Sequence, residues 1–491
     1  MRKIHSLLIL TFAAALLCGC KHKTSEPITR GVDLGWLSEM EHDSVVFRDD
    51  AGHPVDCIEL MRDHGATAVR LRVWVNHKTG WCNKEDVLAM ARRVHAAGLK
   101  VMIDFHYADY WADPQGQPIP EYWRDLNLNE LCLAVAGHTT EILEALKAEG
   151  IEPTWVQIGN ETTNGMLWPY GAIQTTETTR RGVNTHAAEP NSWANYVRLS
   201  NAGYEAAKNV FPNVICITHI DNAFLNRTEW FEQFTSAGGK WDMAGLSHYP
   251  FTQDTINPIQ MNALAKQDII HLYAKFGKPV MVTEIGTASW LPGEALEVMT
   301  DFCNRMSGVE GYAGLFYWEP ECYGGWVPAE YKPLGWGAYG MGCMNEQGQM
   351  SEALKVMLGS ADGSKLLTNP RRDSLLSEWD FYRGEDSVSE KVHIPHDWAI
   401  SGPFDRSNDI QNVVVVANGE KKPSWKTGRS GGLPWMGKGH YHTTIPACDS
   451  LHDYTLFVEG AMSHADIFLN GEEVCYWPYG ITRSTALCCL R

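Results

Sequence analysis

The sequence is short of positive charge and of patterned cysteine. Its 41 Lys and Arg residues stand against 59 Asp and Glu, which gives a net charge of −18, and no stripe rich in Lys or Arg is present. This balance disfavours nucleic acid as a partner, because nucleic acid is bound by basic surfaces. The 13 cysteines show neither CxxC nor Cys/His metal-ligand spacing. We therefore expect no zinc site, no disulfide framework, no metal ion and no cofactor.

The N-terminal apolar run is too short for a stop-transfer helix. It begins with the basic residues Arg2 and Lys3 and ends in the sequence Leu17-Cys18-Gly19-Cys20, which is similar to a bacterial lipobox. We expect residues 1–20 to be a lipoprotein signal peptide, with Cys20 lipidated and residues 21–28 as a tether. The protein would then be anchored by lipid to a bacterial cell envelope. A plain signal peptide is the alternative.

Aromatic side chains are abundant, with 19 Trp and 18 Tyr. Aromatic faces stack on the apolar C–H faces of pyranose rings, so this content is compatible with sugar binding. An ordinary aromatic core accounts for many of the same residues, and composition alone leaves the two interpretations open.

Between about residues 29 and 358, short apolar runs alternate with amphipathic stretches of helical period, such as 84–99 and 129–150. Eight strands with interposed helices over this length predict a (β/α)8 TIM barrel, an α/β fold. The predicted strands are RGVDLGW, TAVRLRVWV, KVMIDFHY, PTWVQIGNE, NVICITHI, MAGLSHYP, KPVMVTEIG and YAGLFYWEP.

Polar and aromatic residues stand at the ends of these apolar strands, where barrel enzymes carry their chemistry. Glu161 ends the fourth predicted strand and Glu284 the seventh, so we expect them to face each other across the barrel mouth. Two such carboxylates can hydrolyse a glycosidic bond, one as acid and the other as nucleophile or as base. A single glutamate at a strand end is more often solvated or salt-bridged, and the pair is what favours catalysis.

Several motifs together resemble glycoside hydrolase family 53, the endo-β-1,4-galactanases. In chain order they are GVDLGWL, DAGHPVDCIELMRDHG, VRLRVWVN, DFHYADYWADPQGQ, WVQIGNET, MVTEIG and LFYWEP. The resemblance implies that Glu161 is the acid/base and Glu284 the nucleophile of a retaining enzyme. It implies that Asn160 donates to the sugar 2-hydroxyl and that Arg72 and Tyr249 orient Glu284.

The resemblance also implies a set of substrate-binding residues. Trp74, Trp111 and Trp318 would be walls of sugar subsites, and His106, Asp109 and His248 polar contacts within the cleft. Bacterial members often hold calcium in a long loop after strand seven, but here TASWLPGEALEVMTDF passes almost directly into a helix. We expect no calcium at that place. The role of the polar insertion over residues 171–193 cannot be interpreted.

A second unit is predicted after a Gly/Ser/Asp-rich linker over residues 359–370. Residues 371–491 carry strand-like runs, with Asn470-Gly471 as a hairpin signal, and predict a β-sandwich. Their motifs VHIPHDWAISGPF and GLPWMGKGHYHTTI resemble the N-terminal sugar-binding domain of family 2 β-galactosidases. The sequence ends at STALCCLR without continuing the strand pattern, and we expect a truncated or frameshifted domain. A complete appended sugar-binding module is the alternative.

Both resemblances imply one substrate, the β-1,4-galactan of pectin side chains, also called type I arabinogalactan. We expect a monomer whose partner is this polysaccharide. One rival hypothesis is another retaining endo-glycanase that cleaves mannan or xylan with the same two glutamates. The other is a catalytically inactive glycan-binding surface lipoprotein, which would be free to lose the glutamates.

Overall fold

The computed structural model describes residues 28–173, 193–251, 256–323, 326–328, 341–366 and 377–384, and shorter segments between 388 and 486. The chain divides into two units, Met1–Thr368 and Asn369–Arg491. The predicted signal peptide with Cys20, and residues 174–192 of the polar insertion predicted over 171–193, lie outside the described residues. No helix of the described segments combines the length and the apolar character needed to cross a membrane.

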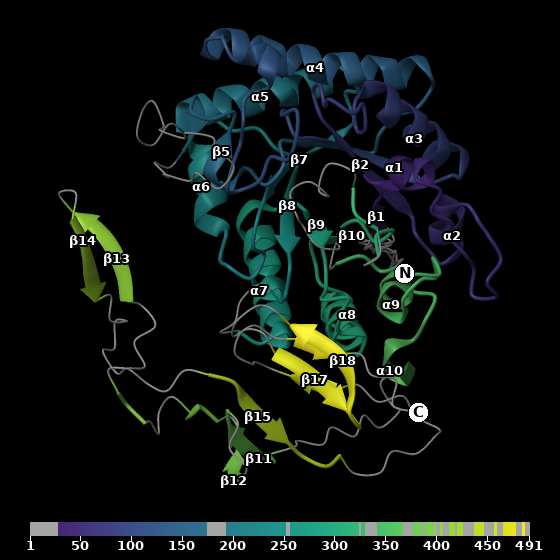
Figure 1. The fold of residues 1–491 in the computed structure, drawn as a ribbon. Coiled ribbons are helices and arrows are strands. Elements are labelled where there is room, and N and C mark those ends of the chain that lie inside the picture. The colour runs from purple at the N-terminus through teal and green to yellow at the C-terminus, as the bar shows by residue number, and fades with distance from the viewer. Residues whose placement is uncertain are drawn as a thin grey trace, which may run out of the picture. The chain divides into compact units, whose positions relative to one another are not determined.

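The first unit is a closed barrel of eight parallel strands, as predicted (Figure 1). Going round the barrel, the strand order is β1-β10-β9-β8-β7-β4-β3-β2. The strands are β1 (Thr29–Asp33), β2 (Ala68–Val73), β3 (Lys100–Phe105), β4 (Trp155–Ile158), β7 (Ile215–Ile220), β8 (Met243–His248), β9 (Val280–Ile285) and β10 (Tyr312–Tyr317). Seven of them lie within the runs predicted from the sequence, and β1 begins one residue before its run, at Thr29.

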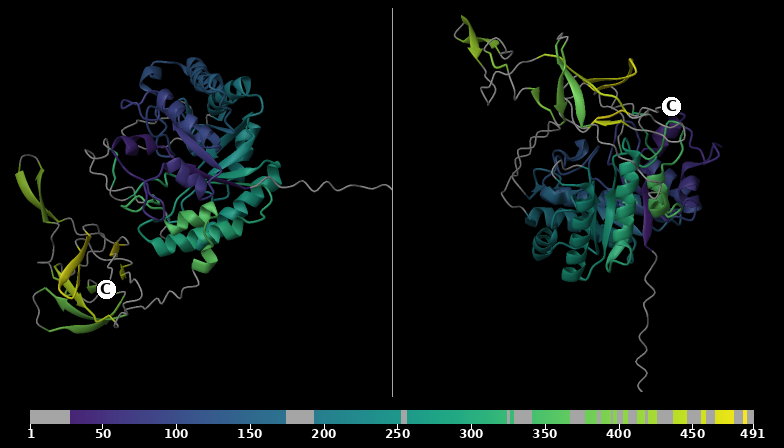
Figure 2. Two further views of the ribbon diagram at one scale, coloured as in Figure 1. Left: turned by 90° about the vertical axis from the view of Figure 1, so that its right-hand side faces the viewer. Right: turned by 90° about the horizontal axis from the view of Figure 1, so that it is seen from below.

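Helices surround the barrel, as the views from two further sides show (Figure 2). They are α1 (Leu37–His42), α2 (Cys57–Asp63), α3 (Lys84–Ala96), α4 (Leu128–Ala148), α5 (Trp193–Val210), α6 (Thr228–Ser236), α7 (Pro258–Phe276), α8 (Pro292–Met306), α9 (Glu352–Leu358) and α10 (Gly363–Leu366). The 3-10 turns Glu121–Trp123 and Thr162–Asn164 and the short strands β5 (Gly165–Met166) and β6 (Gly171–Ala172) complete this unit.

Helix α4 illustrates how the sequence sets these boundaries. Asn127 accepts hydrogen bonds from the backbone N–H groups of Asn129 and Glu130, and the Glu130 side chain bonds back to the N–H of Asn127. This reciprocal capping box satisfies donors that a helix start otherwise leaves unbonded. Helix α10 lies inside the predicted linker, and its Gly363 packs tightly against Thr300 of α8. The first part of that segment therefore packs with the barrel.

The inside of the barrel is built in layers that change from apolar to charged. The floor is a separate apolar cluster: Ala68, Met102, Trp155, Ile217, Met243, Met281 and Phe316. Side chains alternate along a strand, so the next inward positions stand one level higher, and these include Arg70, Asp104 and Gln157. The apolar cluster closes the barrel below this level, so the polar side chains face the open, carboxyl end of the barrel.

A register shift between β8 and β9 aims Glu284 inward. Gly245 pairs with Met281 and Leu246 with Val282, but the next pair is Ser247 with Glu284. One residue of β9 is thus passed over, which is the effect of a β-bulge, and bulges redirect side chains next to active sites. Strict alternation from the floor residue Met281 would instead have pointed Thr283 inward at this level.

The described strands of the second unit are antiparallel, as expected. A three-stranded sheet has the order β12-β11-β15, and the other strands form the pairs β13-β14, β16-β19 and β17-β18. Their bounds are β11 (Glu378–Arg383), β12 (Glu390–His393), β13 (Asn412–Ala417), β14 (Glu420–Trp425), β15 (Gly439–His442), β16 (Leu456–Val458), β17 (Ala465–Leu469), β18 (Glu472–Trp477) and β19 (Ser484–Ala486). The predicted turn at Asn470-Gly471 joins β17 to β18, with φ of 52° and 87°. Positive φ at both central residues is what a tight hairpin turn requires.

Candidate active site

Glu161 and Glu284 meet at the carboxyl end of the barrel. Glu284 lies in β9 and is 4% exposed, whereas Glu161 follows β4 and is partly exposed. A carboxylate oxygen of each and a ring nitrogen of His219 all lie within 4.8 Å of one another. The backbone at Glu161 has φ 45° and ψ 52°, a left-handed conformation that is uncommon for a residue other than glycine and is found at functional sites.

Glu284 is held by charged and polar partners on both oxygens. Arg70 donates to its Oε1 at 2.9 Å, and the Tyr249 hydroxyl donates to its Oε2 at 2.7 Å. Arg70 also forms ion pairs with Asp33 at 2.5 Å and with Asp104 at 2.8 Å. The Arg70 guanidinium is buried, and its three ion pairs fix its position. The fixed guanidinium in turn orients the carboxylate of Glu284.

The two glutamates have different electrostatic surroundings. Burial and then the negative charge of Glu284 raise the pKa of Glu161 well above its ordinary value. Burial also raises the pKa of Glu284, but Arg70 and the hydrogen bond from Tyr249 oppose this shift. Glu161 is therefore the glutamate whose protonated form is favoured, and Glu284 is the one whose ionised form has partners.

His219 and Ser247 form a chain of hydrogen bonds between Glu161 and Glu284. The backbone N–H of Glu161 donates to Nδ1 of His219 at 3.3 Å, and Nε2 of the same ring lies 2.8 Å from Oγ of Ser247. The Ser247 hydroxyl in turn lies 3.4 Å from Oε2 of Glu284. Burial and the charge of Arg70 lower the pKa of His219 well below its usual value. A neutral ring thus spaces the two carboxyl groups without adding a charge between them.

Asn160 is anchored beside the pair. Its Oδ1 accepts from Arg70 at 2.9 Å, and its Nδ2 donates to the carbonyl oxygen of Ala112 at 2.9 Å. An amide nitrogen carries two hydrogens, so the bond to Ala112 uses only one. The side chain is oriented by the protein with donor capacity left for a ligand.

A second arginine, Arg72, lies one level above Arg70. It forms a buried ion pair with Glu319. Its guanidinium carbon lies 4.7 Å from the ring centroid of Trp36, 4.8 Å from that of Trp74 and 4.4 Å from that of Trp111. A Cβ at Gly35 would approach the guanidinium to 2.6 Å, so the chain needs glycine there.

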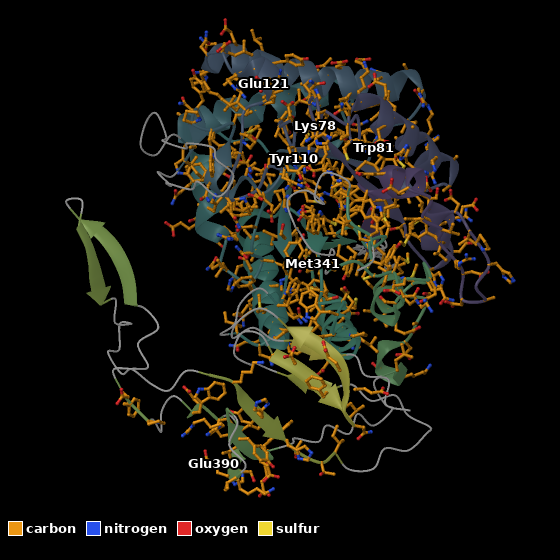
Figure 3. The ribbon with its side chains drawn as sticks, in the orientation of Figure 1. Lys78, Trp81, Tyr110, Glu121, Met341 and Glu390 are labelled. Carbon is orange, nitrogen blue, oxygen red and sulfur yellow. The ribbon has the colours of Figure 1, made fainter. Side chains whose placement is uncertain are left out.

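Aromatic rings form the wall above this level. Trp111 contacts Trp318 with ring centroids 5.9 Å apart, and Trp318 contacts Tyr249 at 6.1 Å. All three rings are partly exposed. On the other side of Trp111, Tyr110 stacks on His77 at 5.5 Å, and Figure 3 shows Tyr110 near Lys78, the residue after His77. The mouth is therefore lined by rings suited to stacking on a sugar.

The model of the family described as glycosyl hydrolase family 53 matches residues 29–357. This match spans the whole barrel, including both glutamates.

The chain belongs to glycosyl hydrolase family 53.

Relatives and solved structures agree with this assignment. The arabinogalactan endo-β-1,4-galactanase of Cellvibrio japonicus is 30% identical over 68% of this chain and 90% of that protein. The enzyme of the same name from Thermothelomyces thermophilus is 29% identical over 59% of this chain and 89% of that protein. A solved fungal β-1,4-galactanase is 27% identical, with a TM-score of 0.56 over 67% of this chain and 99% of that chain. The family 53 catalytic domain of Ignisphaera aggregans has a TM-score of 0.57 at 24% identity, over 68% and 97% of the two chains.

Within this family 53 barrel, two of the predicted roles are wrong, one for Arg72 on β2 and one for Trp74, which directly follows that strand. Arg72 was expected to orient Glu284, but Arg70 makes that contact and Arg72 pairs with Glu319. Residues i and i+2 of a strand share a face, so both arginines point inward and only their height differs. Trp74 was expected to be a subsite wall, but it is 0% exposed and packs against the guanidinium of Arg72 instead.

The three predicted polar contacts all bond within the protein. His248 points away from the barrel interior: its Nε2 lies 2.8 Å from Oδ1 of Asn262, and its ring stacks on Phe302. Strand alternation requires this, because its neighbours Ser247 and Tyr249 both face Glu284. His248 is therefore a buried outer residue and not a cleft contact.

His106 and Asp109 position the loop after β3. His106 uses one ring nitrogen on Asp104, at 3.1 Å, and the other accepts from the N–H of Ala112 at 3.2 Å. Asp109 accepts from the backbone N–H groups of Asn76 and Glu121, at 3.0 and 2.7 Å. Both ring nitrogens of the buried His106 are therefore used within the protein. Asp109 is partly exposed and holds loop backbone, and its contact with substrate stays a prediction.

The sequence-based set lacked several residues of the site, among them Arg70, His219, Ser247, Trp36 and Glu319. Arg70 and Ser247 could have been found from their spacing of two from Arg72 and Tyr249. Glu319 follows Trp318 in a predicted strand end. Trp36 lies beyond the end of β1, and no pattern in the sequence indicates its contact with Arg72.

Proposed function

We propose that the protein is a retaining endo-glycosidase that hydrolyses β-1,4-galactosidic bonds in galactan. The observation that carries the proposal is the close approach of Glu161 and Glu284, with oxygens within 4.8 Å. Carboxyl groups about 5–5.5 Å apart are typical of retaining enzymes, since no water fits between nucleophile and anomeric carbon. The names of the similar proteins support galactan as the substrate.

In the first step the carboxylate of Glu284 attacks the anomeric carbon and a glycosyl–enzyme ester forms. The bond to the leaving oxygen breaks as Glu161 gives that oxygen its proton. The raised pKa of Glu161 supports this role, because an acid must still hold its proton at the working pH. Arg70 and Tyr249 hold Glu284 ionised and oriented for the attack.

In the second step a water molecule attacks the same carbon. Glu161, now ionised, takes a proton from this water, and Glu284 leaves as a carboxylate. Two inversions give net retention. Once Glu284 is esterified, its negative charge no longer raises the pKa of Glu161, so the same group can act as a base. Asn160 lies beside the pair with an N–H directed by its own hydrogen bonds, which suits it to bind the sugar 2-hydroxyl.

The test is product analysis on purified β-1,4-galactan, with mannan and xylan as rival substrates. We expect galacto-oligosaccharides whose newly formed reducing ends are β when first released, as proton NMR would show. Newly formed α ends would contradict the retaining mechanism, and preferential cleavage of mannan or xylan would contradict the substrate. Absence of any cleavage would favour an inactive glycan-binding protein.

We also propose that Cys20 carries a lipid anchor in a bacterial cell envelope and that residues 371–491 include a galactose-binding-like domain. The first proposal predicts that Cys20→Ala moves the protein from the membrane fraction to the soluble fraction at unchanged specific activity. Mass spectrometry of the wild-type N-terminus should find a diacylated cysteine, and an unmodified N-terminus beyond Cys20 would contradict it.

A further inference from the structure

A row of aromatic rings leads outward from Glu284 on one side of the mouth. The Tyr249 hydroxyl donates to Glu284. The ring of Phe251 lies 6.3 Å from that of Tyr249, and the ring of Trp290 lies 5.6 Å from that of Phe251. Tyr249 and Phe251 follow β8, and Trp290 belongs to the short connection between β9 and α8. Two loops at the carboxyl end of the barrel therefore build the row together.

Trp290 ends this row in an exposed position. It is 41% exposed, although a tryptophan gains much of its stabilising effect from burial. Its ring is nearly perpendicular to that of Phe251, at an interplanar angle of 86°, so the two rings are not stacked on each other. Phe251 is itself partly exposed.

The row continues the wall already described. In the other direction from Tyr249, the rings of Trp318 and Trp111 follow at 6.1 and 5.9 Å. The row thus runs from Trp111 past the two glutamates to Trp290 without a break. Successive rings are inclined to one another at 63°, 83°, 78° and 86°, so a bound chain would stack on some of the rings and pass along the edges of the others.

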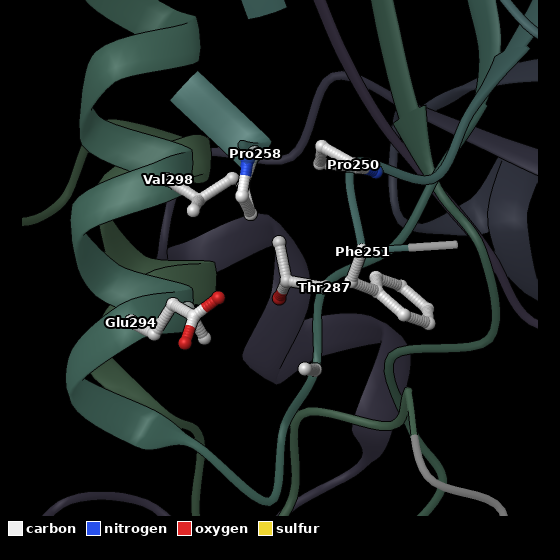
Figure 4. A pocket seen from close by; sticks show the side chains of 8 residues that line it. Pro250, Phe251, Pro258, Thr287, Glu294 and Val298 are labelled. Carbon is white, nitrogen blue, oxygen red and sulfur yellow. The ribbon is translucent and has the colours of Figure 1, made fainter. Parts of the chain in front are cut away.

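The small pocket behind Phe251 does not serve as the binding site. Figure 4 shows Pro250 and Phe251 on one side of it, with Glu294 and Val298 of α8 on the other. Its empty volume is about 180 Å³, below the roughly 300 Å³ at which ligand pockets begin. One surface of Phe251 therefore lines a gap that is too small for a sugar. A sugar would have to contact the part of the Phe251 ring that faces solvent.

We propose that Trp290 and Phe251 form a distal sugar-binding platform for galactosyl units remote from the cleaved bond. The inference rests on the proposed function, and the occupant is a stretch of the β-1,4-galactan chain that also passes the glutamates. Pyranose C–H faces stack on the rings, and no polar side chain is needed for this contact. The platform adds binding to long substrates and biases the length of the products.

The test measures binding and cleavage separately. Binding of galactan fragments is followed by titration calorimetry in Glu284→Ala protein, with and without Trp290→Ala. We expect the added change to weaken binding of long fragments on the order of tenfold, the factor given by about 1.4 kcal/mol. In protein with Glu284 intact, Trp290→Ala should raise KM for galactan by a similar factor at nearly unchanged kcat and shift the product lengths. Trp290→Phe, which keeps a ring, should restore most of the affinity.

Tyr122→Ala is the matched control. Tyr122 is 75% exposed in the 3-10 turn after β3, and it is not part of the row. We expect this variant to bind and cleave as wild type does. The platform is wrong if Trp290→Ala matches wild type, or if Tyr122→Ala is equally impaired. A wild-type protein that leaves galactan intact but cleaves another polymer would instead contradict the substrate, and the Trp290 series would then be repeated on that polymer.

Discussion

Arg70 and Arg72 lie two residues apart on β2, and both side chains point into the barrel, but they have different partners. Arg70 is surrounded by carboxylates and contacts Glu284 directly. Arg72 has one carboxylate partner, Glu319, and three indole rings. An arginine at the lower level positions the carboxylates of the reaction centre. An arginine at the next level packs against the tryptophans of the aromatic wall.

One carboxyl partner of each arginine shows a different balance between burial and the arginine charge. Burial alone would raise the pKa of Asp104, but Arg70 and His106 outweigh it and the pKa is lowered. At Glu319 burial prevails over the pull of Arg72 and raises the pKa to about 8. Arg70 therefore has at least one partner, Asp104, whose ionised form is favoured, whereas the partner of Arg72 has a raised pKa.

The largest effect that separates the two levels should come from Arg70→Met. Removing this guanidinium leaves Glu284, Asp33 and Asp104 as buried carboxylates without their common cation, and breaking such a network typically costs 3–5 kcal/mol. We expect kcat on galactan to fall roughly a thousandfold. Steady-state kinetics measures this, and circular dichroism checks that the barrel remains folded. A folded variant within tenfold of wild type would show that Glu284 does not depend on Arg70.

Tyr249→Phe should have a smaller effect with a pH signature. The lost hydrogen bond stabilises the ionised form of Glu284, so its removal raises the pKa of Glu284. The acidic limb of the kcat/KM profile should then move to higher pH, because the ionised nucleophile appears later as pH rises. We expect a rate loss of about tenfold to a hundredfold, in line with about 1.5–3 kcal/mol for a hydrogen bond to a charged group. Arg72→Lys is the control, and its acidic limb should not move.

The contrast between the arginines also marks what the sequence can predict here. The eight strands and the positions of Glu161 and Glu284 follow from apolar runs and strand counting. Which of Arg70 and Arg72 contacts Glu284 cannot be read from the sequence. Alternation along β2 points both side chains into the barrel, and the contact depends on their positions along the barrel axis relative to Glu284. The register shift that turns Glu284 rather than Thr283 inward depends on pairing with β8 and has no local signature.

Arg72→Lys should affect binding more than chemistry. Lysine keeps the charge but loses the flat group that stacks between indoles, so Trp111 and its neighbour Trp318 would lose their support. We expect KM for galactan to rise roughly fivefold to tenfold while kcat stays within about threefold, which is the pattern of lost uniform binding. The comparison of levels would fail if kcat fell as far as in Arg70→Met.

The smallest effect should come from removing the C-terminal unit. Every residue of both levels lies before residue 322, and a closed barrel has no strand edge that needs a neighbour. The cut belongs after Leu366 rather than at the predicted boundary near Gly359, because α10 packs Gly363 against Thr300 of α8. We expect kcat and KM on soluble galactan within about threefold of the full chain, a change of under roughly 1 kcal/mol.

A second cut after Gly359 should lower the melting temperature while keeping the same kinetics at a temperature where it is folded. A hundredfold loss in the longer, folded version would mean that part of the galactan site is supplied from beyond residue 366, and the two levels on β2 would then be only a portion of the active site.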